Sequence, residues 1–252
     1  MTCRGPTQRG GGGPSQTALE VAGGLAMVYK PGTMPPRYRA VMFDLDGTLA
    51  DTLVDIADAG NYALAQLGRP VQPTARYRYL AGQGARSLVT DALGPGNAGD
   101  IPRGVELFKQ FQLAHGLDHT RPYPGIPEML AGLVSRGMKL AVLSNKPDAA
   151  TQIAVRTVLG DFHFDVVRGQ RDDQPLKPDP RPALAIAREL GVAPEQWFYL
   201  GDTRVDMETA RGAGFFAVGV LWGFRDEPEL REAGAQALIR HPRELLELVE
   251  RD

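Results

Sequence analysis

Two acidic residues stand on alternate positions directly after a short apolar run. The run 40–43 is followed by Asp44 and Asp46, and then by Gly47 and Thr48. A continuous apolar run is typical of a strand buried on both faces of a parallel sheet, and ligands bind outside the carboxyl ends of such strands. Carboxylates at this spacing point to the same side of an extended chain and repel each other unless a proton or a cation separates them. The pair therefore indicates a site for a hard cation such as Mg²⁺.

Polar groups also follow the other predicted strands. They are Ser144 and Asn145 after the strand over 139–143, Lys177 in the loop after the strand over 164–167, and Asp202 and Asp206 after the strand over 197–200. Because parallel strands end at one edge of the sheet, we expect these groups to converge with the first pair. Carboxylates with Mg²⁺, a hydroxyl and an ammonium suit a phosphate dianion. One carboxylate can attack phosphorus, and a second can protonate the leaving oxygen and then activate water.

Strand and helix alternate from residue 122 onward, a pattern that predicts βαβ units, a parallel sheet and right-handed crossovers. Residues 52–121 have a helical pattern with no strand signal, and this segment is large enough to pack on itself. Residues 1–38 contain a glycine run and scattered prolines, so we expect a disordered tail there. We predict an α/β core over 39–51 and 122–252, with an inserted helical segment over 52–121.

Composition excludes several classes of function. The net charge is −2 and no predicted element carries a basic stripe, which argues against nucleic acid as a partner. No segment approaches the roughly 18 apolar residues of a membrane span. Cys3 is the only cysteine, which favours a reducing cytoplasm. His115 and His119 have helical spacing but lack the HExxH pattern of a zinc site. We expect a cytoplasmic monomer or homodimer that acts on a small metabolite.

Four motifs, each at a predicted strand end, resemble those of the haloacid dehalogenase-like hydrolases. They are Asp44-Leu45-Asp46-Gly47-Thr48, Ser144-Asn145, Lys177, and Gly201-Asp202-Thr203-Arg204-Val205-Asp206. The helical insert resembles the small cap of that family. Within the family, the segments 82–89, 123–125, 144–147 and 177–180 look most like phosphoglycolate phosphatases.

The resemblance implies a Rossmann-like parallel sheet with strand order 5-4-1-2-3, a cap over the strand ends, and a role for each motif residue. Asp44 would be the nucleophile and a metal ligand. Asp46 would be the general acid and base, and would bind the metal through its main-chain carbonyl. Asp202 would be the third metal ligand, and Asp206 would hold Lys177 or a metal-bound water. Ser144 and Lys177 would bind the phosphoryl group, with Asn145 as a further substrate-binding candidate.

The implied activity is Mg²⁺-dependent hydrolysis of a small phosphomonoester through an aspartyl-phosphate, with 2-phosphoglycolate as the first candidate. Alternatives are a phosphatase for a sugar phosphate or pyrophosphate, a phosphomutase of the same superfamily, and a non-catalytic binding protein. Arg86, beside a Gly-x-Gly turn of the insert, is a candidate clamp for a substrate carboxylate. The alternative for Arg86 is a surface position on the helix predicted over 84–93.

Overall fold

A computed structural model describes residue 1, residues 19–20 and 26–27, and residues 38–250. The chain divides into two compact units, Met1–Pro35 and Pro36–Asp252. In the first unit, β1 (Leu19–Glu20) pairs antiparallel with β2 (Ala26–Met27). Apart from these strands and the residues at its two ends, the tail predicted over 1–38 lies outside the described residues.

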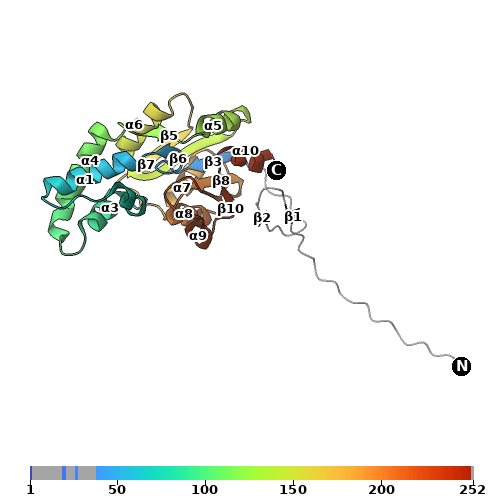
Figure 1. Ribbon diagram of the computed structural model, residues 1–252. Coiled ribbons are helices and arrows are strands. Elements are labelled where there is room, and N and C mark those ends of the chain that lie inside the picture. The colour runs from blue at the N-terminus through green and yellow to red at the C-terminus, as the bar shows by residue number, and fades with distance from the viewer. Residues whose placement is uncertain (2–18, 21–25, 28–37, 251–252) are drawn as a thin grey trace. The chain divides into compact units, whose positions relative to one another are not determined.

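A six-stranded parallel sheet forms the centre of the second unit (Figure 1). Its strands, from one edge to the other, are β10 (Ala237–Ile239), β9 (Phe216–Val220), β8 (Trp197–Gly201), β3 (Ala40–Phe43), β6 (Lys139–Pro147) and β7 (Val166–Gln170). All neighbouring strands run parallel. The predicted order 5-4-1-2-3 is confirmed for β9-β8-β3-β6-β7. The edge strand β10 was not predicted, because three residues are too short to show a periodic pattern.

Helices cover both faces of this sheet, as the right-handed crossovers require (Figure 1). One face packs against α7 (Arg181–Glu189), α8 (Arg204–Ala213) and α9 (Glu227–Glu232), and the other against α5 (Ile126–Ser135), α6 (Asp148–Val158) and α10 (Arg243–Glu250). In β3, Ala40 and Met42 belong to the apolar cluster of the first face. Val41 and Phe43 point to the opposite face, because side chains alternate along a strand. All four are fully buried, which fixes the start of the acidic loop at the centre of the sheet.

The insert consists of α1 (Leu53–Gln66), α2 (Tyr77–Leu80), α3 (Gly84–Leu93) and α4 (Ile101–His115), with 3₁₀ turns at Thr74–Arg76 and Ala98–Asp100. These helices share an apolar cluster of their own, to which Phe224, after β9, also contributes. The chain enters the insert at β4 (Ala50–Asp51) and leaves it at β5 (Arg121–Pro122), and these two strands pair antiparallel. The two chain segments that connect the core to the insert are therefore held side by side.

Two of the predicted strands have wrong boundaries. The strand predicted to end at residue 143 continues as β6 to Pro147, so it includes Ser144 and Asn145. The next strand begins at Val166 and not at residue 164. Its start is set by Asp165, whose backbone N–H donates to the Leu140 carbonyl at 2.8 Å and whose carboxylate accepts from the Leu140 N–H at 2.9 Å.

We expect Asp165→Asn to lower the free energy of unfolding by about 1 kcal/mol at pH 7. Burial by itself raises the pKa of Asp165, but the hydrogen bonds from Lys139 Nζ (2.6 Å) and the Leu140 N–H outweigh it and hold this pKa below its usual value. A lowered folded-state pKa stabilises the protein above the unfolded-state pKa, and this stabilisation is lost as the pH falls through the folded-state value. Urea unfolding at pH 7, 5 and 3 should show the difference from wild type narrowing below about pH 4. A constant difference would mean that the carboxylate charge is not its source.

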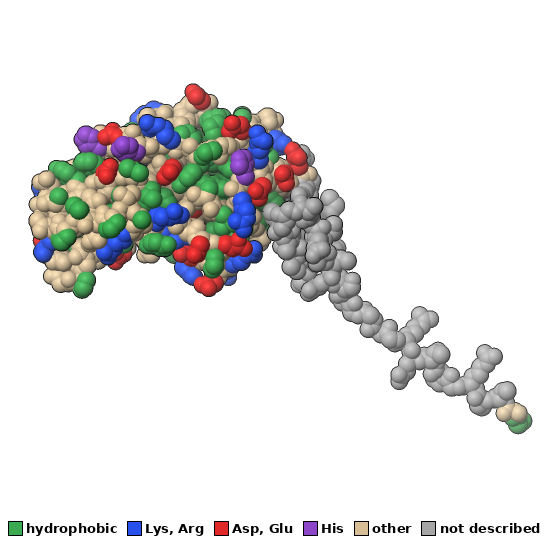
Figure 2. Space-filling view, viewed as in Figure 1, with side chains coloured by type: hydrophobic (Ala, Val, Ile, Leu, Met, Phe, Trp, Pro, Cys, Tyr) green, Lys and Arg blue, Asp and Glu red, His purple; other side chains and the backbone are tan. Residues whose placement is uncertain are grey.

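The visible surface of the second unit carries Lys and Arg side chains interspersed with Asp and Glu (Figure 2). No helix in the described part of the chain is both long enough and apolar enough to cross a membrane.

Candidate active site

The loop after β3 is folded tightly at the carboxyl edge of the sheet. The Asp44 N–H donates to the Leu200 carbonyl of β8 at 2.9 Å, which places the Asp44 side chain at the strand end. Gly47 closes the turn with φ +85° and donates to the Ala50 carbonyl at 2.9 Å. A Cβ on Gly47 would overlap the Asp202 carboxylate. Glycine is therefore required here both for the backbone conformation and for the approach of Asp202.

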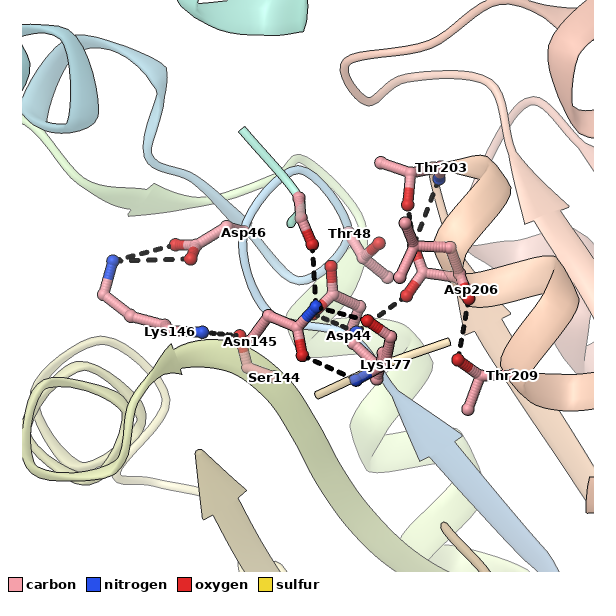
Figure 3. Close-up of polar contacts among 12 residues, drawn as sticks. Asp44, Asp46, Thr48, Ser144, Asn145, Lys146, Lys177, Thr203, Asp206 and Thr209 are labelled. Carbon is pink, nitrogen blue, oxygen red and sulfur yellow. Dashed lines mark hydrogen bonds and ion pairs between the residues drawn. The ribbon is translucent and has the colours of Figure 1, made fainter. Parts of the chain in front are cut away.

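Lys177 lies between two carboxylates (Figure 3). Its Nζ is 2.9 Å from Asp44 Oδ1 and 2.7 Å from Asp206 Oδ1, and its side chain is 2% exposed. Asp206 also accepts from the Thr203 hydroxyl and backbone N–H, which caps α8 and fixes the carboxylate. Segments that are far apart in the sequence thus hold the ammonium in one place.

Asp44, Asp202 and Asp206 form a cluster in which oxygen atoms of the three carboxylates lie within 4.8 Å of one another. Burial, together with the nearby Asp206 and Asp46 charges, raises the pKa of Asp44 to about 7 against the opposing effect of Lys177. Burial and the charges of Asp206 and Asp44 also raise the pKa of Asp202 well above its usual value. Burial alone lowers the pKa of Lys177, but Asp206 and Asp44 raise it well above its ordinary value.

This charge balance fits a bound cation. Three buried carboxylates lie close together and one ammonium pairs with two of them, so the cluster carries excess negative charge in a poorly solvated place when all three are ionised. Asp202 accepts hydrogen bonds from the Phe224 N–H (2.7 Å) and the Thr48 hydroxyl (3.1 Å), which orient its oxygens. An all-oxygen donor set suits a hard divalent ion such as Mg²⁺.

Ser144 and Asn145 lie near the end of β6, and their side chains have different surroundings. The Ser144 hydroxyl accepts the Lys146 N–H at 3.2 Å, and its side chain borders the same cavity as Asp44. The Asn145 amide donates to the Gly82 carbonyl (2.9 Å) and the Lys177 carbonyl (3.0 Å) and accepts the Lys177 N–H (2.9 Å). Its polar atoms are therefore occupied in joining the insert to the Lys177 loop.

Asp46 points away from the carboxylate cluster toward Lys146, a residue that the sequence analysis did not single out. Lys146 Nζ lies 3.0 and 3.4 Å from the two Asp46 oxygens, and its side chain is 3% exposed. In Figure 3 this pair and the Lys177–Asp206 pair are drawn on opposite sides of Asp44. Strand alternation gave no signal for Lys146, because β6 is irregular between Leu143 and Pro147 and three successive residues there border the same cavity.

A cavity of about 40 Å³ lies between the insert and the strand ends. Its polar walls are Asp44, Asp46, Gln112, Ser144, Asn145 and Lys146, and its remaining walls are mainly apolar side chains and glycines of the insert. Gln112 is a second residue that the sequence analysis did not single out, although a polar residue one turn after the buried Phe108 interrupts the apolar face of α4. Arg86 is exposed on α3 and is not part of the cavity wall.

The sequence model of haloacid dehalogenase-like hydrolases matches residues 41–220, a span that contains every acidic residue of this site. The chain belongs to the haloacid dehalogenase-like hydrolases. Among the relatives of this hydrolase is the phosphoglycolate phosphatase of Pseudomonas putida, 35% identical over 200 residues, which are 77% of this chain and 72% of the relative. The N-acetylmuramic acid 6-phosphate phosphatase of Pseudomonas aeruginosa is 33% identical over 220 residues, which are 85% of this chain and 96% of the relative.

The fold of this hydrolase is shared with solved structures. CbbY from Rhodobacter sphaeroides, solved in complex with phosphate, superposes with a TM-score of 0.67 at 28% identity, over 82% of this chain and 96% of CbbY. The α/β parallel-sheet core predicted from the sequence is thereby confirmed.

Proposed function

We propose that this hydrolase cleaves a small phosphomonoester with the help of Mg²⁺, and that 2-phosphoglycolate is its substrate. The observation that supports this most directly is the cluster of Asp44, Asp202 and Asp206 around Lys177, next to a cavity bordered by Asp46. Such a site offers a nucleophile, a proton carrier and positive charge for phosphoryl oxygens. The phosphoglycolate phosphatase relative supports the substrate.

Each side chain has a distinct role in the proposed reaction. An Asp44 oxygen attacks phosphorus, the bond from phosphorus to the ester oxygen breaks, and Asp46 gives a proton to that oxygen. Asp46 then takes a proton from the water that cleaves the aspartyl-phosphate, which releases phosphate and restores Asp44. Lys177 and the Ser144 hydroxyl hold phosphoryl oxygens. Asp44, Asp202 and the Asp46 main-chain carbonyl would hold Mg²⁺, which when bound neutralises phosphate charge.

The insert over 52–121 would act in this reaction as a cap that excludes water and contacts the leaving group. A cavity of about 40 Å³ holds roughly three water molecules, since one water needs about 10–15 Å³ by this measure. A phosphate ester is larger than this, so either candidate substrate requires the cap to move. The relative that acts on N-acetylmuramic acid 6-phosphate keeps a sugar phosphate as the second candidate.

Phosphate release from a panel of esters tests the substrate. The panel contains 2-phosphoglycolate, ethyl phosphate, N-acetylmuramic acid 6-phosphate and pyrophosphate. We expect the highest kcat/KM for 2-phosphoglycolate, by about 10-fold or more. A higher value for the sugar phosphate would refute the substrate and leave the phosphatase in place. An isomerised product without free phosphate would refute hydrolysis.

Removal of divalent metal should abolish phosphate release, because Asp44 and Asp202 would then repel both each other and the phosphate dianion. Added Mg²⁺ should restore it. Mg²⁺ should also raise the melting temperature of the metal-free protein, because an ion that binds only the folded state stabilises it. Calorimetry in EDTA and in excess Mg²⁺ measures this second effect independently of turnover. Equal melting temperatures and equal rates in both buffers would contradict the metal site.

A further inference from the structure

The ammonium of Lys146 is buried in the cavity wall although the phosphoryl site already contains Lys177. Lys146 lies near the end of β6 and borders the same cavity as Ser144, and its side chain is 3% exposed. Its contact in the structure is Asp46, with one oxygen at 3.0 Å and the other at 3.4 Å. An ammonium has three donors, so this pairing leaves hydrogen-bonding capacity for a further oxygen ligand.

Gln112 borders the same cavity from the insert, on α4, whereas Lys146 borders it from the core, on β6. The residue is 7% exposed, and its side-chain oxygen is buried without a hydrogen-bond partner. A buried polar atom without a partner destabilises the folded protein, so such atoms are rare unless a ligand or water completes their hydrogen bonds. Rotation of the carboxamide by half a turn presents its NH₂ group in place of the oxygen. Gln112 can therefore meet either an acceptor or a donor on a bound molecule.

The other residues that the insert contributes to this wall have apolar side chains or none. The wall contributed by the insert is otherwise Ile56, Ala81, Gly82, Gly84, Ala85, Leu88 and Phe108. Among the described residues that line the cavity, Lys146 is the one with a positive side chain. Arg86, the clamp suggested by the sequence, is exposed on α3 outside this wall. A negatively charged leaving group would thus find its counter-ion at Lys146.

We propose that Lys146 and Gln112 together bind a carboxylate on the leaving group, and so select phosphate esters of small hydroxy acids. This proposal rests on the proposed phosphatase function and assigns the residues that set its specificity. The ammonium supplies charge and the carboxamide NH₂ supplies a directional hydrogen bond from the cap. One recognition residue belongs to the core and the other to the insert, so a bound carboxylate bridges the two.

The test compares 2-phosphoglycolate with ethyl phosphate, which lacks the carboxylate but has a similar length. Lys146→Met should lower kcat/KM for 2-phosphoglycolate by about 100-fold and for ethyl phosphate by less than about 10-fold. The difference is expected because only the 2-phosphoglycolate carboxylate would be buried without its counter-ion. Gln112→Glu, which places a negative charge against the carboxylate, should lower the preference for 2-phosphoglycolate by about 10-fold. Lys146→Arg keeps the charge and should retain part of the preference. Lys139→Met removes an exposed lysine from the other end of β6 and is the matched control. It should keep the wild-type kcat/KM for both esters.

Equal losses on the two esters in Lys146→Met, with a shifted pH profile of kcat, would show that Lys146 acts on Asp46 and would overturn the proposal. Binding separates this failure from failure of the phosphatase function. In the Asp44→Asn background with Mg²⁺, titration calorimetry with uncleaved 2-phosphoglycolate should give a Kd that rises about 100-fold on addition of Lys146→Met. An unchanged Kd refutes the carboxylate site whatever the enzyme hydrolyses. A raised Kd in a protein whose wild type hydrolyses no ester supports the site and refutes the phosphatase.

Discussion

Asp44→Asn should lower kcat for phosphate release by about 10⁴-fold or more, because an amide cannot form the aspartyl-phosphate. The Asn side chain has nearly the same shape, so the loss should come without unfolding. Asp165→Asn, at the opposite end of β6 from the site, is the matched control and should keep the wild-type kcat. Single-turnover phosphate release measures both variants. A loss below about 10-fold would contradict Asp44 as the nucleophile.

Asp44→Asn should also stabilise the metal-free protein while it removes activity. The pKa of Asp44 is raised to about 7, so the folded chain keeps a proton that the unfolded chain has lost between about pH 4 and pH 7. Stability therefore falls as the pH rises through this window, and the loss persists above it. Asparagine removes that loss. In EDTA at pH 8 we expect Asp44→Asn to melt at a higher temperature than wild type, with little difference near pH 4. A lower melting temperature at pH 8 would contradict the charge excess in the cluster.

Lys177→Met should destabilise the protein by about 3–5 kcal/mol, because it leaves Asp44 and Asp206 buried without their shared cation. It should also lower kcat by about 10³-fold, because a donor to the phosphoryl oxygens is lost where transition-state charge develops. Urea unfolding and phosphate release measure the two effects. Lys139→Met is again the surface control, with a loss of about 0–1 kcal/mol.

A double variant separates charge from packing at Lys177. If the destabilisation comes from unpaired carboxylates, Lys177→Met combined with Asp206→Asn should recover part of the stability and none of the activity. If the two single losses simply add, the coupling between Lys177 and Asp206 is absent. That result would contradict the buried pair as the source of the effect.

The sequence by itself determined that the sheet is parallel and at which edge the acidic groups meet, whereas the strand order was implied by the resemblance to the hydrolase family. Each predicted strand is a short apolar run that ends in polar residues, and parallel strands joined by right-handed crossovers bring such ends together. Asp44 and Lys177 are 133 positions apart in the chain and 2.9 Å apart in the fold, and local patterns predicted that they meet at one edge of the sheet. The position of Asp206 beside Lys177 was implied by the family resemblance and is confirmed by the 2.7 Å contact between the two side chains.

Only the tertiary structure decided which side chains face the cavity between insert and core. Arg86 and Gln112 both lie on predicted helices, but the rotation of each helix against the core puts the first in solvent and the second in the cavity wall. Asn145 lies near the end of β6, and its side-chain amide donates hydrogen bonds to the Gly82 and Lys177 carbonyls. These outcomes depend on how separate elements pack, and periodicity along one segment contains no information about the neighbour it will meet. Lys146 belongs to the same case, since β6 is irregular beyond Leu143 and only the packed insert makes Lys146 the positive side chain of the cavity wall.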